Sequence, residues 1–228
     1  MAKRGKKYRQ AVDVVERERL YPLAEALELV VKLSYAKFDE TVEAAVHLGI
    51  PKGQSVRDTL IFPRQFKAAK RVMVFAQGEK VQEALSAGAT YAGGSEFVEK
   101  IRAGWLDFDI CVATPDMMRE VGKLGQILGR RGLMPNPKSR TVTTDLAGVL
   151  AEVQRGRAEF RSDKTGGVHL AVGKVSLGAD AIAENVAVMM DELRRKKPAA
   201  AKGRYFESLV LSSTMGPGVP VDLAQFEV

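Results

Sequence analysis

The middle of the chain constrains the fold most, because short apolar segments alternate there with amphipathic ones from residue 71 to about 155. Residues 72–76 and 108–113 are almost entirely apolar, which is typical of strands buried on both faces. Residues 79–87 and 96–103 instead repeat their apolar side chains at helical spacing. This alternation favours a parallel β-sheet covered by helices. We therefore expect an α/β unit in the middle of the chain.

The two ends of the chain have other periodicities. Before the middle block we expect helices at residues 10–19 and 23–34 and strands at 38–48 and 56–62. After it, residues 158–161 and 168–172 are predicted to form two arms of a hairpin around a turn at 163–167. A long helix at 179–197 and a final strand at 205–213 follow. Periodicity alone leaves open whether these two outer blocks join.

Several classes of protein are excluded by what the sequence lacks. One cysteine, Cys111, cannot make a disulfide framework, and with only two histidines it cannot close a zinc site. No apolar stretch approaches the roughly 20 residues of a membrane span, and no signal core follows the basic start, so we expect a cytoplasmic protein with no membrane partner. Phosphate-binding and nucleophile motifs are missing, so no catalytic residue, metal or cofactor is predicted.

The position of the positive charge is more informative than its size. The 228 residues carry a net charge of +7, and residues 1–9 contain five cations and no acid. This start of the chain is interpreted either as a disordered, solubilising tail or as an arm that neutralises phosphates. The sequence does not decide between the two.

Residues 122–140 form a second notable segment, with four glycines, five cations and no acid. Either the glycines interrupt a long loop, or they allow the backbone to approach phosphates closely. The cations are Lys123, Arg130, Arg131, Lys138 and Arg140.

Four ordered motifs resemble the bacterial ribosomal protein L1 family of the large subunit. They are Ala-Lys-Phe-Asp-Glu-Thr-Val-Glu at 36–43, Leu-Gly-Arg-Arg-Gly-Leu-Met-Pro-Asn-Pro-Lys at 128–138, Phe-Arg-Ser-Asp-Lys-Thr-Gly at 160–166 and Ser-Thr-Met-Gly-Pro at 213–217. The resemblance implies an α/β protein of two domains. Residues 1–66 and 157–228 would form a split RNA-binding domain, and residues 67–156 an inserted Rossmann-like α/β/α domain, with hinges near 65–68 and 156–157.

The same resemblance implies a function and a set of contacts. The family binds 23S rRNA at the L1 stalk of the large ribosomal subunit, assists release of deacylated tRNA from the E site and represses translation of its own operon mRNA. By motif match the RNA contacts fall on Lys37, Phe38, Glu40, Thr41, Arg161, Asp163, Lys164, His169, Lys174, Ser212, Thr214, Met215 and Gly216. The cationic segment 122–140 becomes the candidate for a tRNA-facing surface.

Departures from the family pattern and two rival functions complete the expectations. Arg130 and Arg140 stand where relatives usually have proline and glycine, and Pro63-Arg64-Gln65 replaces a Pro-His-Gly motif near the first hinge. One rival is an enzyme that binds a nucleotide or phosphometabolite, suggested by the α/β block. The other is a regulator that binds RNA outside ribosomes.

Overall fold

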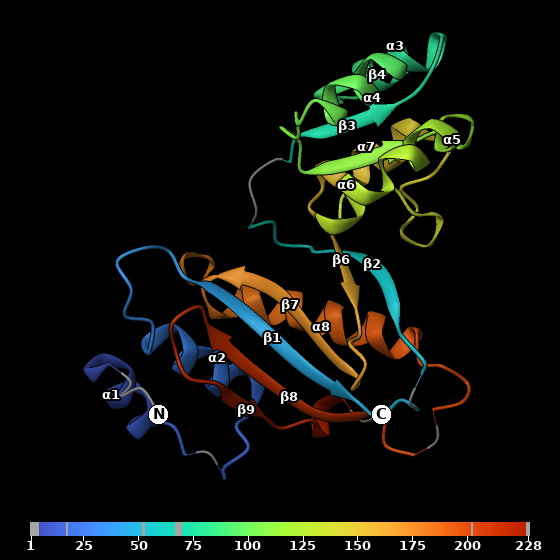
Figure 1. Ribbon diagram of the computed structural model, residues 1–228. Helices are drawn as coiled ribbons and strands as arrows, with labels where there is room; N and C mark the ends of the chain where they lie inside the picture. Colours follow the sequence, from blue (N-terminus) through green and yellow to red (C-terminus); the bar gives the residue numbers. More distant parts are fainter. Residues whose placement is uncertain (1–4, 17, 52, 67–69, 202, 227–228) are drawn as a thin grey trace. The chain divides into compact units, whose positions relative to one another are not determined.

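The computed structural model describes residues 5–226 except 17, 52, 67–69 and 202. The chain divides into two compact units (Figure 1). Unit 1 combines Met1–Phe66 with Ala158–Val228, and unit 2 is Lys67–Arg157. The mixed α/β class predicted from the sequence is confirmed, since both units contain sheets and helices.

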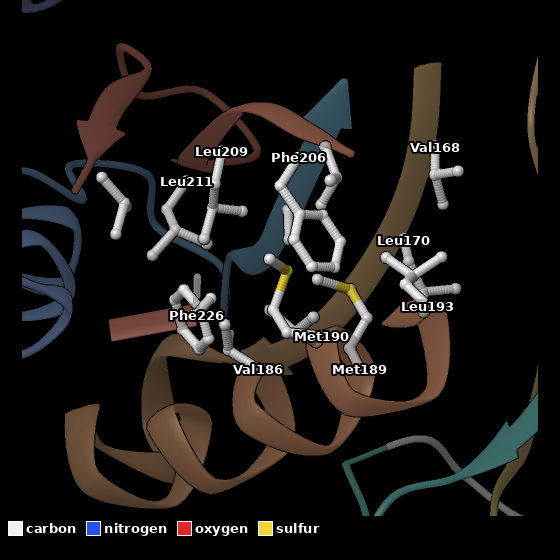
Figure 2. Close-up of a cluster of buried hydrophobic side chains, with 14 of the residues drawn as sticks. Val168, Leu170, Val186, Met189, Met190, Leu193, Phe206, Leu209, Leu211 and Phe226 are labelled. Carbon is white, nitrogen blue, oxygen red and sulfur yellow. The ribbon is translucent and has the colours of Figure 1, made fainter. Parts of the chain in front are cut away.

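Unit 1 contains a four-stranded antiparallel sheet in the order β7–β1–β8–β9. The strands are Gly167–Lys174 (β7), Thr41–Leu48 (β1), Phe206–Ser213 (β8) and Val219–Val221 (β9). In β1 every second residue is buried, so the strand has one face in the core and one face open to solvent. Figure 2 shows the core side, where Met189, Met190 and Leu193 lie against side chains of β7 and β8.

Two helices cover the buried face of this sheet, α2 (Leu23–Lys32) and α8 (Ala179–Arg195). A third, α1 (Lys6–Val14), begins four residues earlier than the helix predicted at 10–19. Ala11 is the buried residue of this helix, and Val15, which follows its last residue in an extended conformation, is part of the apolar core of unit 1. The basic residues 6–9 are therefore helical, whereas residues 1–4 lie outside the described part of the chain.

The predicted hairpin of residues 158–161 and 168–172 is wrong. The first arm, β6 (Arg157–Arg161), pairs with β2 (Arg57–Ile61) in a separate two-stranded sheet, and the second arm is part of β7 on the edge of the larger sheet. Both β6 and β2 bury apolar side chains in the core of unit 1, including Phe160 and Leu60. The pairing is thus selected by shared burial between distant segments and not by the short connection between β6 and β7.

Unit 2 has a three-stranded parallel sheet in the order β4–β3–β5, formed by Tyr91–Gly93, Val72–Phe75 and Ile110–Ala113. Met73 and Phe75 of β3 face one apolar cluster, and Val72 and Val74 face another. The first cluster includes residues of α4 (Ser95–Arg102), α5 (Met118–Val121) and α6 (Gly125–Arg130). The second includes residues of α3 (Glu79–Ser86) and α7 (Leu146–Gln154). Helices therefore cover both faces of the sheet, as the buried apolar runs require.

Two segments of the chain connect the units, and each is bonded to residues of one unit. Buried Asn185 of α8 accepts a hydrogen bond from the Arg64 amide (3.1 Å) and donates to the Arg64 and Val172 carbonyls (2.9 and 2.7 Å), which fixes the first connection to unit 1. At the second connection the buried Arg157 side chain pairs with Glu152 of unit 2 at 3.1 Å. Of the hinge expected at 65–68, residues 67 and 68 lie outside the described residues.

No helix in the described parts of the chain is both long enough and apolar enough to span a bilayer.

Candidate nucleic-acid interface

The solvent-facing side of the sheet in unit 1 is built mainly from small residues. Ala45 of β1 lies between His169 of β7 and Val210 of β8, and Glu43 lies between Ala171 and Ser212. Ala45, Ala171 and Ser212 are small and leave parts of this surface low enough for an extended ligand to approach the backbone, whereas Glu43 projects from it as an exposed acid. The predicted RNA contacts gather at the two ends of this surface, which we call the open face.

Glu40 organises the first end of the open face, where β1 begins and β8 ends. Its Oε1 accepts hydrogen bonds from the backbone amides of Tyr35 (3.0 Å) and Ala36 (2.8 Å), and its Oε2 accepts one from the Met215 amide (3.0 Å). The carboxylate therefore joins two loops that are 175 residues apart in the sequence. Glu40 is only 1% exposed, so the structure gives this predicted contact residue an internal bonding role.

The charge of Glu40 is stabilised by these bonds. Burial alone raises the pKa of a carboxyl group, but the Ser213 hydroxyl and the amides of Ala36, Met215 and Tyr35 outweigh it and hold the pKa of Glu40 below its usual value. The carboxylate is therefore ionised at neutral pH.

Thr214 makes a second link between the same two loops. Its hydroxyl accepts a hydrogen bond from the Thr41 amide (2.9 Å) and donates to the Thr41 carbonyl (3.2 Å). The Tyr35 hydroxyl donates to the Met215 carbonyl at 2.8 Å. A Cβ at Gly216 would lie 2.5 Å from Ser213 Oγ, so a larger residue there would require the Ser213 hydroxyl to move. The loop of residues 214–216 is thus held in one conformation before any ligand binds.

Exposed groups surround this fixed centre. Phe38 and Met215 are large apolar side chains that are 56% and 49% exposed, and Lys37 is exposed beside them. Lys174 pairs with Thr41 in the sheet and lies 3.6 Å from Asp39. Asp39 also accepts hydrogen bonds from the hydroxyl (2.8 Å) and the amide (3.1 Å) of Ser176. The Ser176 bonds, helped by Lys174, lower the pKa of Asp39.

The second end of the open face lies where β6 leaves its sheet and β7 begins. Arg161, Lys164 and His169 line an open groove of about 740 Å³ there, together with residues 53–55. Across the sheet, His169 is opposite Ala45, near the middle of β1, and Gly167 at the start of β7 is opposite His47 near the far end of β1 from Thr41. At about 3.3 Å per residue, the eight residues of β1 separate the two ends by roughly 25 Å. That span fits several nucleotides and not one small ligand.

Asp163 shapes the turn at this second end. Its Oδ1 accepts three hydrogen bonds of 2.8 Å, from the amide and hydroxyl of Thr165 and from the Gly167 amide. These bonds lower the pKa of Asp163, the Thr165 hydroxyl most. Gly166 has a φ of +95°, and a Cβ at this position would collide with the Leu48 carbonyl. The sequence Asp-Lys-Thr-Gly is therefore a bonded turn that presents Lys164.

The cationic segment 122–140 lies in unit 2 and is largely helical, so the expectation of one long loop is wrong. It contains a 3-10 helix (Gly122–Leu124), α6 and a second 3-10 helix (Pro137–Ser139). Leu124 and Leu128 are fully buried and hold the segment against the sheet. The helical periodicity was hidden by glycine, which is a poor helix former.

The glycines of this segment leave one side of it bare. A Cβ at Gly122, Gly125 or Gly129 would have no atom within 4 Å, and these positions recur at the spacing of one helix face. Lys123, Arg130, Arg131 and Arg140 are exposed around them, while the Lys138 side chain lies outside the described part of the structure. Within the described residues, the ion pairs include none from these four cations. Arg140 has a φ of +50°, in the left-handed region that favours glycine.

Some residues of the first end are not visible from sequence patterns. Tyr35 and Ser176 both bond to residues more than a hundred positions away, so no local periodicity marks them. In the parts of the chain that the structure describes, no three His, Cys, Asp or Glu side chains are grouped so that they could hold a metal ion.

Comparison with known proteins identifies the family. A model of the ribosomal protein L1p/L10e family matches residues 30–217. The large ribosomal subunit protein uL1 of Treponema denticola is 58% identical over 220 residues, which cover 96% of this chain and 97% of the relative. The same protein of Treponema pallidum strain Nichols is 53% identical over 217 residues, covering 95% and 96%. The match extends across both ends of the open face and across unit 2, so the chain belongs to the ribosomal protein L1 family.

Proposed function

We propose that the chain is a constituent of the large ribosomal subunit and binds 23S rRNA at the L1 stalk through the open face of unit 1. Membership of a family whose relatives are named large ribosomal subunit proteins supports the first part. The observation that carries the second part is the fixed centre formed by Glu40 and Thr214, which holds exposed Phe38 and Met215 beside Lys37 and Lys174. The family is one of non-enzymatic structural proteins, so the rival interpretation as a nucleotide-binding enzyme is wrong.

The residue types match the parts of a folded RNA. Lysine and arginine at both ends neutralise phosphates, and each such contact releases counterions. Exposed Phe38 offers a flat apolar surface for a ribose or base, and the backbone of residues 214–216 can approach a 2′-hydroxyl closely. Because the body of unit 1 is almost neutral once residues 1–9 are set aside, with a charge of −2, we expect shape and not a general positive field to select the RNA.

The test is binding of the full chain to a stalk-base fragment of 23S rRNA while the salt concentration is varied. We expect affinity to fall steeply with salt. Phe38→Ala removes a stacking surface worth about 1–3 kcal/mol and should weaken binding roughly 5- to 150-fold. Leu85→Ala is the control, because Leu85 is an exposed apolar residue of unit 2. Affinity that is indifferent to salt, or equal effects of the two substitutions, would refute the proposed interface.

We further propose that the exposed cations of segment 122–140 face the E-site tRNA and assist its release. The bare glycine face and the unpaired charges among the described residues support this role. Ribosomes carrying a Lys123→Gln, Arg130→Gln, Arg131→Gln variant should release deacylated tRNA more slowly while the variant still binds the stalk RNA normally. Unchanged release kinetics would refute this part and leave the rRNA proposal intact.

The open face is also our candidate for binding the operon mRNA and repressing its translation. One surface cannot hold two RNAs at once, so stalk RNA and the operon mRNA should compete for it. Added protein should inhibit translation of that mRNA in a cell-free system, and stalk RNA should relieve the inhibition by competition. Failure of stalk RNA to compete would place the mRNA on another surface. A protein that acts within bacterial ribosomes is cytoplasmic. If this protein were found only outside large subunits, the rival function, a regulator that binds RNA outside ribosomes, would be favoured.

A further inference from the structure

The start of α1 and the loop of residues 214–216 form the two walls of one groove. Residues 5–8 make the first wall, and Tyr35 with residues 214–216 makes the second, around an open volume of about 670 Å³. In Figure 1, α1 lies near the end of the sheet where β1 begins and β8 ends. The groove therefore continues the open face beyond the residues predicted from the family motifs.

The first wall is part of the folded unit and not a loose tail. Ala11 and Val15 bury α1 against the rest of unit 1. The segment after the helix is held by Tyr21, whose hydroxyl accepts a hydrogen bond from the Glu16 amide (3.1 Å) and whose own amide donates to the Pro220 carbonyl (3.1 Å). Lys6 and Lys7 thus stand at a defined place in the free protein.

The charges on this wall are unfavourably placed in the absence of a ligand. Lys6 and Lys7 occupy the first turn of α1, where the partial positive charge of the helix end repels cations. That turn contains no acid, and no side chain caps it. In the described part of the chain, no ion pair joins either lysine to an acid. A bound anion would offset both the lysine charges and the helix end.

We propose that an RNA strand lying on residues 214–216 continues through this groove, where Lys6 and Lys7 bind its phosphates. This inference rests on the proposed rRNA binding and adds α1 to the contact surface. The two tyrosines give the groove apolar walls for the riboses between those phosphates, and Gly216 keeps the opposite side low. The basic start of the chain then acts as a positioned binding element and not as a diffuse source of attraction.

A matched set of single substitutions on one helix tests the proposal. Lys6→Gln, Lys7→Gln and Arg9→Gln each remove one charge from α1, but Arg9 does not line the groove. We expect each lysine substitution to weaken binding to the stalk-base fragment about three- to tenfold and to lower the salt slope by about 0.7–0.9. Arg9→Gln should change affinity less than twofold. Loss of the lysines removes repulsion from the helix end, so far-UV circular dichroism should show α1 retained.

Three results would overturn the proposal. Equal weakening by Arg9→Gln and Lys7→Gln would show attraction by net charge alone. Unchanged RNA affinity in both lysine variants would exclude a phosphate contact. Normal RNA affinity combined with poor incorporation into large subunits would assign the groove to a protein partner. Failure of the proposed function looks different, since the unsubstituted chain would then not bind the fragment at all, or Phe38→Ala would have no effect.

Discussion

Replacing Glu40 by glutamine tests whether a buried acid fixes the RNA surface before RNA binds. The substitution keeps the size of the side chain and removes its charge. One oxygen can still accept hydrogen bonds from the Tyr35 and Ala36 amides, but the new amide group then faces the Met215 amide, which is itself a donor. The link to residues 214–216 is therefore broken while the rest of the cavity stays filled.

The size of the effect follows from the bonds that are lost. An amide left unpaired in a buried place costs about 1–3 kcal/mol, and bonds to a charged acceptor are roughly twice as strong as neutral ones. Relief of carboxylate burial returns part of this cost. We expect Glu40→Gln to lower the free energy of unfolding of unit 1 by about 2–3 kcal/mol, or roughly 1 M in the urea midpoint.

The two units can be followed separately in one experiment. Trp105, the single tryptophan, is partly buried and packs against the apolar core of unit 2, so its fluorescence reports unfolding of that unit. Hydrogen exchange of the amides in β1 and β8 reports unit 1. We expect faster exchange in β1 and β8 and no change in the Trp105 transition, together with weaker binding to the stalk-base RNA.

Glu43→Gln is the control, because Glu43 is an exposed acid on the same strand and should change stability by less than about 0.5 kcal/mol. The lowered pKa of Glu40 adds a test of sign. Its stabilising contribution is complete above the usual value of 4.5 and is lost as the pH falls through the lower value of the folded state. The unsubstituted protein and Glu40→Gln should therefore converge in stability in acid. Equal losses of unfolding free energy in Glu40→Gln and Glu43→Gln would refute the reasoning. So would a stability difference between Glu40→Gln and the unsubstituted protein that grows in acid.

Three further predictions concern single residues. Arg140→Gly should relieve a left-handed backbone and raise the stability of unit 2 by about 1 kcal/mol, seen as a higher Trp105 midpoint; a lower midpoint would contradict this. Burial raises the pKa of the Cys111 thiol, so a thiol reagent should react only as fast as unit 2 opens, and reaction of the folded protein at the rate of a free thiol would show otherwise. Asp163→Asn keeps an oxygen acceptor for Thr165 and Gly167 and should bind stalk RNA better than Asp163→Ala, with slower Gly167 amide exchange; the reverse order would exclude a turn-forming role.

Sequence patterns predicted strands best where the side chains on both faces of the strand are buried. The strands β3 and β5 lie inside a sheet covered on both faces, so their runs of apolar residues identify them without any partner. The pairing of β6 failed for the opposite reason. Its partner β2 is about a hundred residues away, and only the packing of the folded unit selects it over the neighbouring β7.

The candidate site shows the same limit. Motif resemblance marked Glu40 and Thr214, but no local pattern shows that the first is buried or that the second bonds across 173 residues to Thr41. The groove beside α1 was equally hidden, since it depends on where Ala11 and Val15 place the helix. What remained unpredictable was therefore the contact between distant segments, which is also what gives the surface its shape.

The two acids among the expected RNA contacts make the final point about this surface. A carboxylate facing a phosphate would repel it, so acids on an RNA-binding face need another explanation. Glu40 accepts three backbone hydrogen bonds, and Asp163 accepts two backbone bonds and one from a hydroxyl, so both carboxylates hold the chain that presents their neighbours. Lowered pKa values keep both ionised at the pH where RNA binds. The acids supply fixed geometry and Lys37, Lys164 and Lys174 supply attraction, which is how a nearly neutral unit can select one folded RNA.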